Sequence, residues 1–201
     1  MLDDVHDLWL SISATLAENA PRTAACLNGP ASQAALAEVR ERSGRLVPES
    51  LLQSLACHDG MQLLPLQARL FPPSFIPYEA AEMMASYHLW AEITEAESAD
   101  SWNGDGAAGE SRISYSSKFW PIATDSAGDE YFIDLRDGDM HGSVCCWYQS
   151  SGAVGEPLWG SVSSLLSDVA SALTAAGEGK ERKVLGCRLI FEEQAVKWCR
   201  V

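Results

Sequence analysis

Three short hydrophobic and aromatic segments lie close together in the second half of the chain. They cover residues 118–123, 130–135 and 143–149, and each carries the aromatic or β-branched side chains typical of strands. The stretches between them, 125–128 and 137–139, consist of turn-forming Asp, Ser, Ala and Gly. Connections this short leave no room for a crossover helix, so they predict an antiparallel meander.

Apolar residues at helical spacing account for most of the remaining chain. Pro48 is expected to be the first residue of one helix, and Gly60 is expected to stop it. Helices are predicted in five segments: residues 4–18, 31–43, 48–60, 78–97 and 162–176. The apolar side of the fourth is assigned to Ala80, Met83, Met84, Tyr87, Leu89 and Trp90.

The order of these segments predicts an α+β fold, a single domain with helices packed on an antiparallel sheet. The 201 residues suffice for one core. Within this single domain, residues 1–201, we expect the central part to span about residues 31–176, with a helix in residues 1–20 and a terminal hairpin in residues 180–201 as additions. Residues 63–66 are expected to be extended, and residues 98–111 to form a mobile surface loop.

The charge balance restricts the classes of partner. With 28 Asp and Glu against 14 Lys and Arg, the formal net charge is −14. Such a surface repels phosphate backbones and anionic lipids, so we expect a basic protein partner and neither nucleic acid nor membrane. Acidity serving only solubility is the alternative. No apolar run reaches transmembrane length, and the first seven residues carry three acids and no Lys or Arg, so we expect a cytoplasmic protein.

Two groups of acids are candidate partner-binding residues, because a local negative field steers a basic partner and accelerates encounter. A merely solvated face is the alternative. The first group, on the predicted turns, is Asp125, Asp129, Asp137 and Asp139, and the second is Glu95, Glu97 and Asp100. Together with Asp134, also taken as a turn acid, the first group superficially resembles a calcium loop. Its spacing does not match one, so no metal is expected.

Catalytic and cofactor motifs are scarce. The six cysteines show no metal-binding spacing, and no glycine-rich phosphate loop precedes a helix, so no cofactor is expected. A nucleophilic Cys145 or Cys146 paired with His141 is the one enzymatic alternative. Because His141 lies between Gly138 and Gly142, an exposed turn residue is the simpler interpretation.

Three motifs in this order carry a family resemblance. The first is LVPESLL at residues 46–52, followed by HDG at 58–60. The second is WPIATDSAGD at 120–129 with FIDL at 132–135, and the third is GSV at 142–144 followed by Trp147. Together they resemble the SUKH superfamily, which joins yeast Smi/Knr-type cell-wall regulators to bacterial immunity proteins.

The resemblance implies an α+β domain without enzymatic activity that binds other proteins. Its most common role would be to neutralise a secreted toxin, often a nuclease, in the cell that makes it. A regulatory or scaffolding role in cell-envelope or signalling assemblies is the alternative. We expect a monomer or weak dimer. The core positions that we expect within the motifs are Leu51, Leu55, Trp120, Ile122, Phe132 and Ile133.

Overall fold

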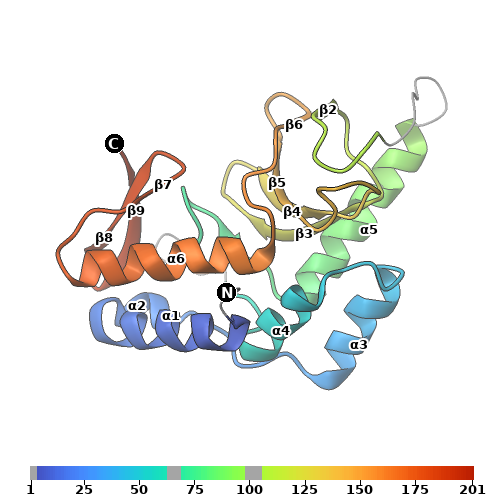
Figure 1. Cartoon of the computed structure of the whole chain (residues 1–201). Helices are drawn as coiled ribbons and strands as arrows, with labels where there is room; N and C mark the ends of the chain where they lie inside the picture. The colour runs from blue at the N-terminus through green and yellow to red at the C-terminus, as the bar shows by residue number, and fades with distance from the viewer. Residues whose placement is uncertain (1–3, 63–68, 98–105) are drawn as a thin grey trace.

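A six-stranded antiparallel sheet contains the predicted meander in the computed structural model, which describes residues 4–62, 69–97 and 106–201 (Figure 1). The middle of the sheet consists of β3 (Phe119–Thr124), β4 (Glu130–Asp134) and β5 (Val144–Tyr148). These strands pair antiparallel in chain order, so the meander is confirmed. The expected extended segment 63–66 lies outside the described residues.

Strands of two residues extend this meander at both edges. β1 (Ile76–Pro77) pairs with β3, β6 (Ala153–Val154) pairs with β5, and β2 (Arg112–Ile113) pairs with β6. The strand order is therefore β1-β3-β4-β5-β6-β2. Two residues are too few to show the alternation that predicts a strand, so the sequence does not reveal these three.

Helices occur in all five segments where apolar spacing predicts them. A short helix, α2 (Pro21–Ala24), is an addition. Pro48 is the extended N-cap of α4 and not its first helical residue. In α5, Leu89 is 57% exposed, so its assignment to the apolar side was wrong. The five helices are α1 (Val5–Asn19), α3 (Gln33–Arg42), α4 (Glu49–Cys57), α5 (Ala80–Glu97) and α6 (Val162–Gly177).

Gly60 has a different role from the predicted one. Helix α4 already ends at Cys57, and Gly60 adopts a left-handed φ of +65° three residues later. A Cβ at this position would lie 2.4 Å from the carbonyl carbon of Tyr78. Glycine is therefore required because two backbone segments cross closely here, and not because a helix must be terminated. The neighbouring Asp59 accepts a hydrogen bond from the Ala80 amide at the start of α5.

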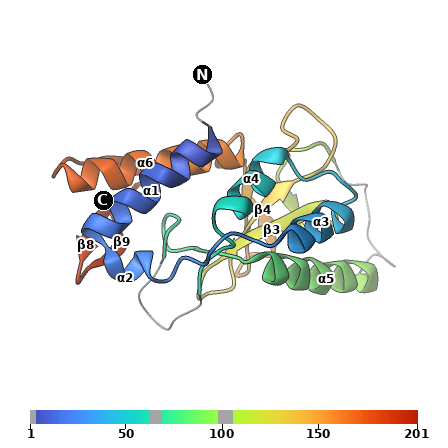
Figure 2. The same cartoon turned by 90° about the horizontal axis from the view of Figure 1, so that it is seen from below.

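The end of the chain forms the predicted hairpin, with one further strand. β8 (Cys187–Glu192) pairs with β9 (Ala195–Arg200), and β7 (Lys183–Val184) lies on the other side of β8. Figures 1 and 2 show this smaller sheet beside α1 and α6, at the end of the molecule opposite α5. Along the described residues, no helix combines the length and the apolar character required to cross a bilayer.

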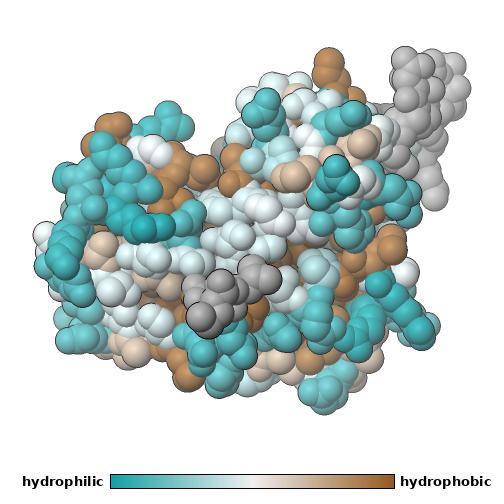
Figure 3. All heavy atoms as spheres, viewed as in Figure 1, coloured by the Kyte–Doolittle hydropathy of each residue, from teal (hydrophilic) through white to brown (hydrophobic). Residues whose placement is uncertain are grey.

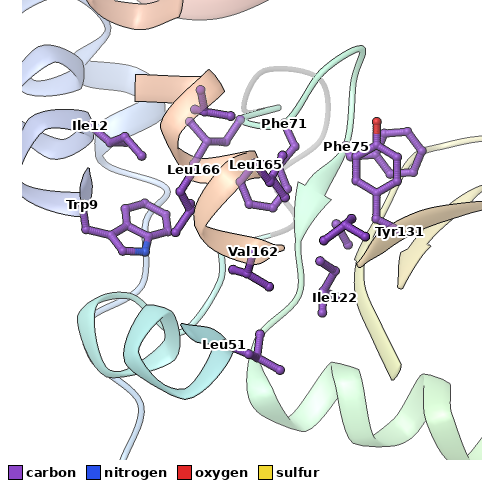
Figure 4. Close-up of a cluster of buried hydrophobic side chains, with 14 of the residues drawn as sticks. Trp9, Ile12, Leu51, Phe71, Phe75, Ile122, Tyr131, Val162, Leu165 and Leu166 are labelled. Atoms are coloured by element: carbon purple, nitrogen blue, oxygen red, sulfur yellow. The ribbon is translucent and has the colours of Figure 1, made fainter. Parts of the chain in front are cut away.

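One hydrophobic core joins the N-terminal helices, the larger sheet and the terminal hairpin. Trp9 and Ile12 of α1 approach Leu166 of α6, and Val162 lies between Leu51 and Leu165 (Figure 4). All six core positions expected within the motifs are buried. The opposite face of the sheet carries a second cluster, which consists of Tyr115, Phe119, Phe132, Cys145, Trp147 and Val154, with Trp90 packed against it.

We predict that Trp120→Ala lowers the free energy of unfolding by about 3–5 kcal/mol, because the indole is fully buried and leaves a cavity. Urea denaturation measures this loss. Leu89→Ala is the control and should change stability by less than about 0.5 kcal/mol, since Leu89 is largely exposed. Equal losses in the two variants would contradict the assignment of Trp120 to the core.

Candidate partner-binding surface

A row of side chains crosses the outer end of the six-stranded sheet. Tyr148 on β5 pairs with Ala153 on β6, which in turn pairs with Ile113 on β2. Asp129, just before β4, extends the row, because its carboxylate accepts a hydrogen bond of 2.9 Å from the Gln149 amide. Residues paired across strands point to the same face. The four side chains, Asp129, Tyr148, Ala153 and Ile113, therefore form one surface, which we call the Tyr148 row.

Two members of the Tyr148 row expose large apolar side chains. Ile113 is 85% exposed and Tyr148 is 39% exposed. Figure 3 shows hydrophobic atoms projecting at the top of the molecule, where Figure 1 places β2 and β6. Clustered exposed aromatic and aliphatic groups are typical of interaction sites. This end of the sheet is therefore the candidate partner-binding surface.

The aromatic cluster on the opposite face anchors the backbone of the Tyr148 row. Trp147 and Val154, each next to a member of the row in the chain, are buried in that cluster. Trp90 of α5 stacks on Tyr115 with ring centroids 4.3 Å apart, and Trp147 meets Trp90 edge-on. Packing of this kind fixes rotamers and backbone together. The row is thus displayed from a rigid support.

A buried ion pair fixes the segment that leads to β2. Asp134 and Arg136 are 0% and 1% exposed, and the guanidinium donates to the carboxylate at 2.7 Å. Asp134 also accepts from the Gly109 amide at 2.9 Å, and Arg136 donates to the Glu110 carbonyl at 2.9 Å. Asp134 is therefore not a turn acid. The second half of the expected loop 98–111 is held against the sheet, with Ala108 buried, and the first half, 98–105, lies outside the described residues.

Glu130 is a second buried carboxylate that sequence reasoning missed. It accepts hydrogen bonds from the Tyr78 hydroxyl, the Ser86 hydroxyl and the Trp90 indole, at 2.6–2.7 Å. Burial, together with the nearby Glu130 charge, raises the pKa of Tyr78 far above its ordinary value. Ser86 and Trp90 thereby attach α5, and Tyr78 the segment just before it, to β4 next to Asp129. No sequence signal marks Glu130, because an acid beside a turn looks like a solvent-exposed residue.

The predicted turn acids separate into two pairs. Asp125 and Asp129 lie in the β3–β4 turn, where Asp125 accepts hydrogen bonds from the Ala127 and Asp129 amides. Asp137 and Asp139 follow β4 and are exposed at the opposite end of that strand. Five residues of strand hold the two pairs roughly 15 Å apart. Only the first pair lies at the Tyr148 row, which includes Asp129 and which Asp125 adjoins, so the four acids do not create a single local field.

Residues 30–168 match the profile of the SMI1 / KNR4 family (SUKH-1). The chain belongs to this family. No curated protein sequence matches the chain significantly. The match confirms the predicted resemblance to the SUKH superfamily and the α+β class. The SUKH-1 region contains the whole six-stranded sheet, and with it the Tyr148 row, whereas α1 and the smaller sheet lie outside it.

The second acidic group of this SUKH-1 chain is only partly placed. Glu95 and Glu97 belong to the last turns of α5, but their side chains are not among the described atoms. Asp100 lies outside the described residues altogether. A partner-binding role for these acids, and for those in the turns, stays a prediction.

The cysteines of the enzymatic alternative are not paired with His141. Cys145 is buried with its thiol 3.8 Å from the Ser143 hydroxyl, whereas the His141 ring bonds to the Arg136 carbonyl. Burial raises the pKa of Cys145 to about 11 and that of Cys146 to about 12, which disfavours the nucleophilic thiolate. Within the described ranges, no three His, Cys, Asp or Glu side chains are grouped to hold a metal ion.

We predict that Arg136→Met destabilises the SUKH-1 chain by about 3–5 kcal/mol, because it leaves the Asp134 charge buried and unpaired. The double variant with Asp134→Asn should be more stable than Arg136→Met alone, since it removes that charge and keeps an acceptor. Urea denaturation measures both, and hydrogen exchange should rise in residues 106–113. Arg40→Met, which breaks an exposed pair with Glu49, should cost at most about 1 kcal/mol. A similar loss of stability in the Arg136 and Arg40 variants would contradict the structural role of the buried Asp134–Arg136 ion pair.

We also predict slow alkylation of Cys145 and Cys146 in the folded chain. At pH 8 their raised pKa values leave little thiolate, so iodoacetamide should react with Cys145 about 100-fold, and with Cys146 about 1000-fold, more slowly than in the urea-unfolded chain. Peptide mass spectrometry distinguishes the two from the other four cysteines. Equal rates in the folded and unfolded chain would restore the nucleophilic cysteine as a hypothesis.

Proposed function

We propose that this SUKH-1 chain is a non-enzymatic, immunity-type protein that binds and neutralises a basic, nuclease-like toxin through the Tyr148 row. The observation that carries the proposal is the exposed pair of Tyr148 and Ile113 on a rigid sheet end, beside Asp125 and Asp129. The SUKH-1 family is consistent with an immunity-type or regulatory role.

The composition of the surface supports this proposal. Protein interfaces combine an apolar centre, in which Tyr is enriched, with a polar rim. Tyr148 and Ile113 supply the apolar centre, and the acids of the β3–β4 turn supply one side of the rim. Because the backbone is fixed by the aromatic cluster, binding would require little ordering of the chain.

Charge complementarity supports the choice of partner. A nuclease is cationic around the cleft that binds phosphates, and an acidic protein can occupy that cleft. The net charge of −14 attracts such a partner at long range, and Asp125 and Asp129 act at short range. A nuclease inhibitor acts where the nucleic acid lies, so we propose the cytoplasm as its compartment.

We predict that the immobilised chain captures one basic protein from lysate of the cell that makes it, and that moderate salt weakens the capture. The purified chain should then abolish the catalytic activity of that protein at a stoichiometric ratio. Retained activity with every captured protein would refute the immunity role. Several partners of moderate affinity would favour the regulatory alternative instead.

With the captured partner we predict that Tyr148→Ala raises the dissociation constant about 30-fold or more, as expected for a central aromatic anchor. Asp125→Asn with Asp129→Asn should slow association at low salt about tenfold, while the amides keep the turn's hydrogen-bond acceptors. The matched control is Asp137→Asn with Asp139→Asn, which removes the same charge at the other end of β4. Surface plasmon resonance measures both rates. Equal slowing by the two double variants would mean that net charge alone steers the partner.

A further inference from the structure

The outer edge of β9, which faces away from β8, has no neighbouring strand in the described part of the structure. In the smaller sheet, β9 has a neighbouring strand on one side only. The Val196 amide points away from β8, because it donates to the Thr23 hydroxyl at 2.9 Å. Since backbone N–H groups alternate sides along an antiparallel strand, the amides of Trp198 and Arg200 also point away from β8. The Val201 amide, one residue further, donates back to Gly186, as this alternation requires.

Helix α2 covers only the beginning of this edge. The Arg22 amide donates to the Gln194 carbonyl, and the Thr23 hydroxyl accepts a hydrogen bond from the Val196 amide. Within the described part of the chain, the outward amides of Trp198 and Arg200 make no further hydrogen bond. An edge of this kind is a template for another extended chain.

A cleft of about 340 Å³ lies along β9. One wall is β9 itself, including Val196 and Trp198, and the other is formed by Arg69, Pro73 and Ser74. The Trp198 indole donates to the Leu70 carbonyl, which fixes the two walls relative to each other. An added strand needs about 4.8 Å beside β9. The cleft supplies space next to Val196 and Trp198, and Arg200 lies beyond its lining.

The cleft and the end of β9 beyond it carry more cations than acids in an otherwise acidic chain. The cleft is lined by Arg22, Arg69 and Lys197 against Glu192 and Glu193, and Arg200 follows on β9. The Arg69 guanidinium is held by the Ser74 carbonyl and the Ser126 hydroxyl, at 3.3 and 3.2 Å, and within the described residues it meets no carboxylate. Arg200, exposed at the end of β9, likewise makes no ion pair there. The acids at the other end, Glu192 and Glu193, already pair with Lys197 and Arg22.

We propose that the outer edge of β9 binds an extended acidic segment of another protein as an added strand. The outward amides of Trp198 and Arg200 donate to the backbone of that segment, and Arg69 and Arg200 bind its carboxylates. This edge lies outside the SUKH-1 region and at the opposite end of the molecule from α5 (Figure 2). The site does not depend on the immunity proposal, although it adjoins the Tyr148 row at the β3–β4 turn, where Arg69 donates to the Ser126 hydroxyl.

The test is selection of dodecapeptides from a random phage library against the full chain, followed by fluorescence polarisation with the selected peptides. We expect acidic sequences without proline. Arg200→Pro removes the outward amide and leaves the β8 ladder intact, so it should weaken binding at least tenfold. Arg200→Ala keeps the amide and should weaken binding about threefold. Arg69→Glu should abolish binding, whereas Arg45→Glu, exposed elsewhere, should leave it unchanged.

Circular dichroism establishes that each variant is folded. Selection of no acidic peptide, or of acidic peptides that bind Arg200→Pro and Arg69→Glu as tightly as the unchanged chain, would overturn the proposal. So would a concentration-dependent dimer in sedimentation that Arg200→Pro abolishes, because a second copy of the chain would then occupy the edge.

Discussion

The strands β3, β4 and β5 are buried on both faces, and the rest of the structure is arranged around this constraint. Trp120, Ile133 and Val144 face the main core, while Phe119 and Phe132 face the aromatic cluster. A sheet with two apolar faces must be covered twice. Helices α1, α4 and α6 take part in the main core, and the Trp90 side chain of α5 packs against the other cluster. The Tyr148 row begins where this burial ends.

Two buried carboxylates at the ends of β4 connect these layers. Glu130 is held by three neutral donors from the α5 side, and Asp134 is held by Arg136. Burial of an acid is tolerated only when hydrogen bonds or a cation replace water. In a chain with twice as many acids as cations, these two carboxylates therefore stabilise the fold, while Asp125 and Asp129 stay partly exposed in the β3–β4 turn.

The long helices and the strands of the meander and the hairpin could be predicted from the sequence. Features that depend on how the strands pair could not. Apolar periodicity located the five long helices, the meander and the hairpin, and the motifs led to the correct family. The two-residue strands carry no periodicity. Glu130 and Asp134 carry no sign of burial in the sequence, because their partners Trp90 and Arg136 are identified only once the sheet has formed. Tyr148 and Ile113 become neighbours only through the pairing of β6.

The two edge strands of the larger sheet flank α5 in the chain: β1 precedes the helix and β2 follows it. The helix and its flanking segments thus connect the first strand of the sheet to the last. Both edges are only two residues long, so neither offers a ladder on which a foreign strand can extend. Lateral growth of the larger sheet is therefore limited by the shortness of its two edge strands. Substitutions in the Tyr148 row therefore do not by themselves create a long edge through which copies of the chain could polymerise.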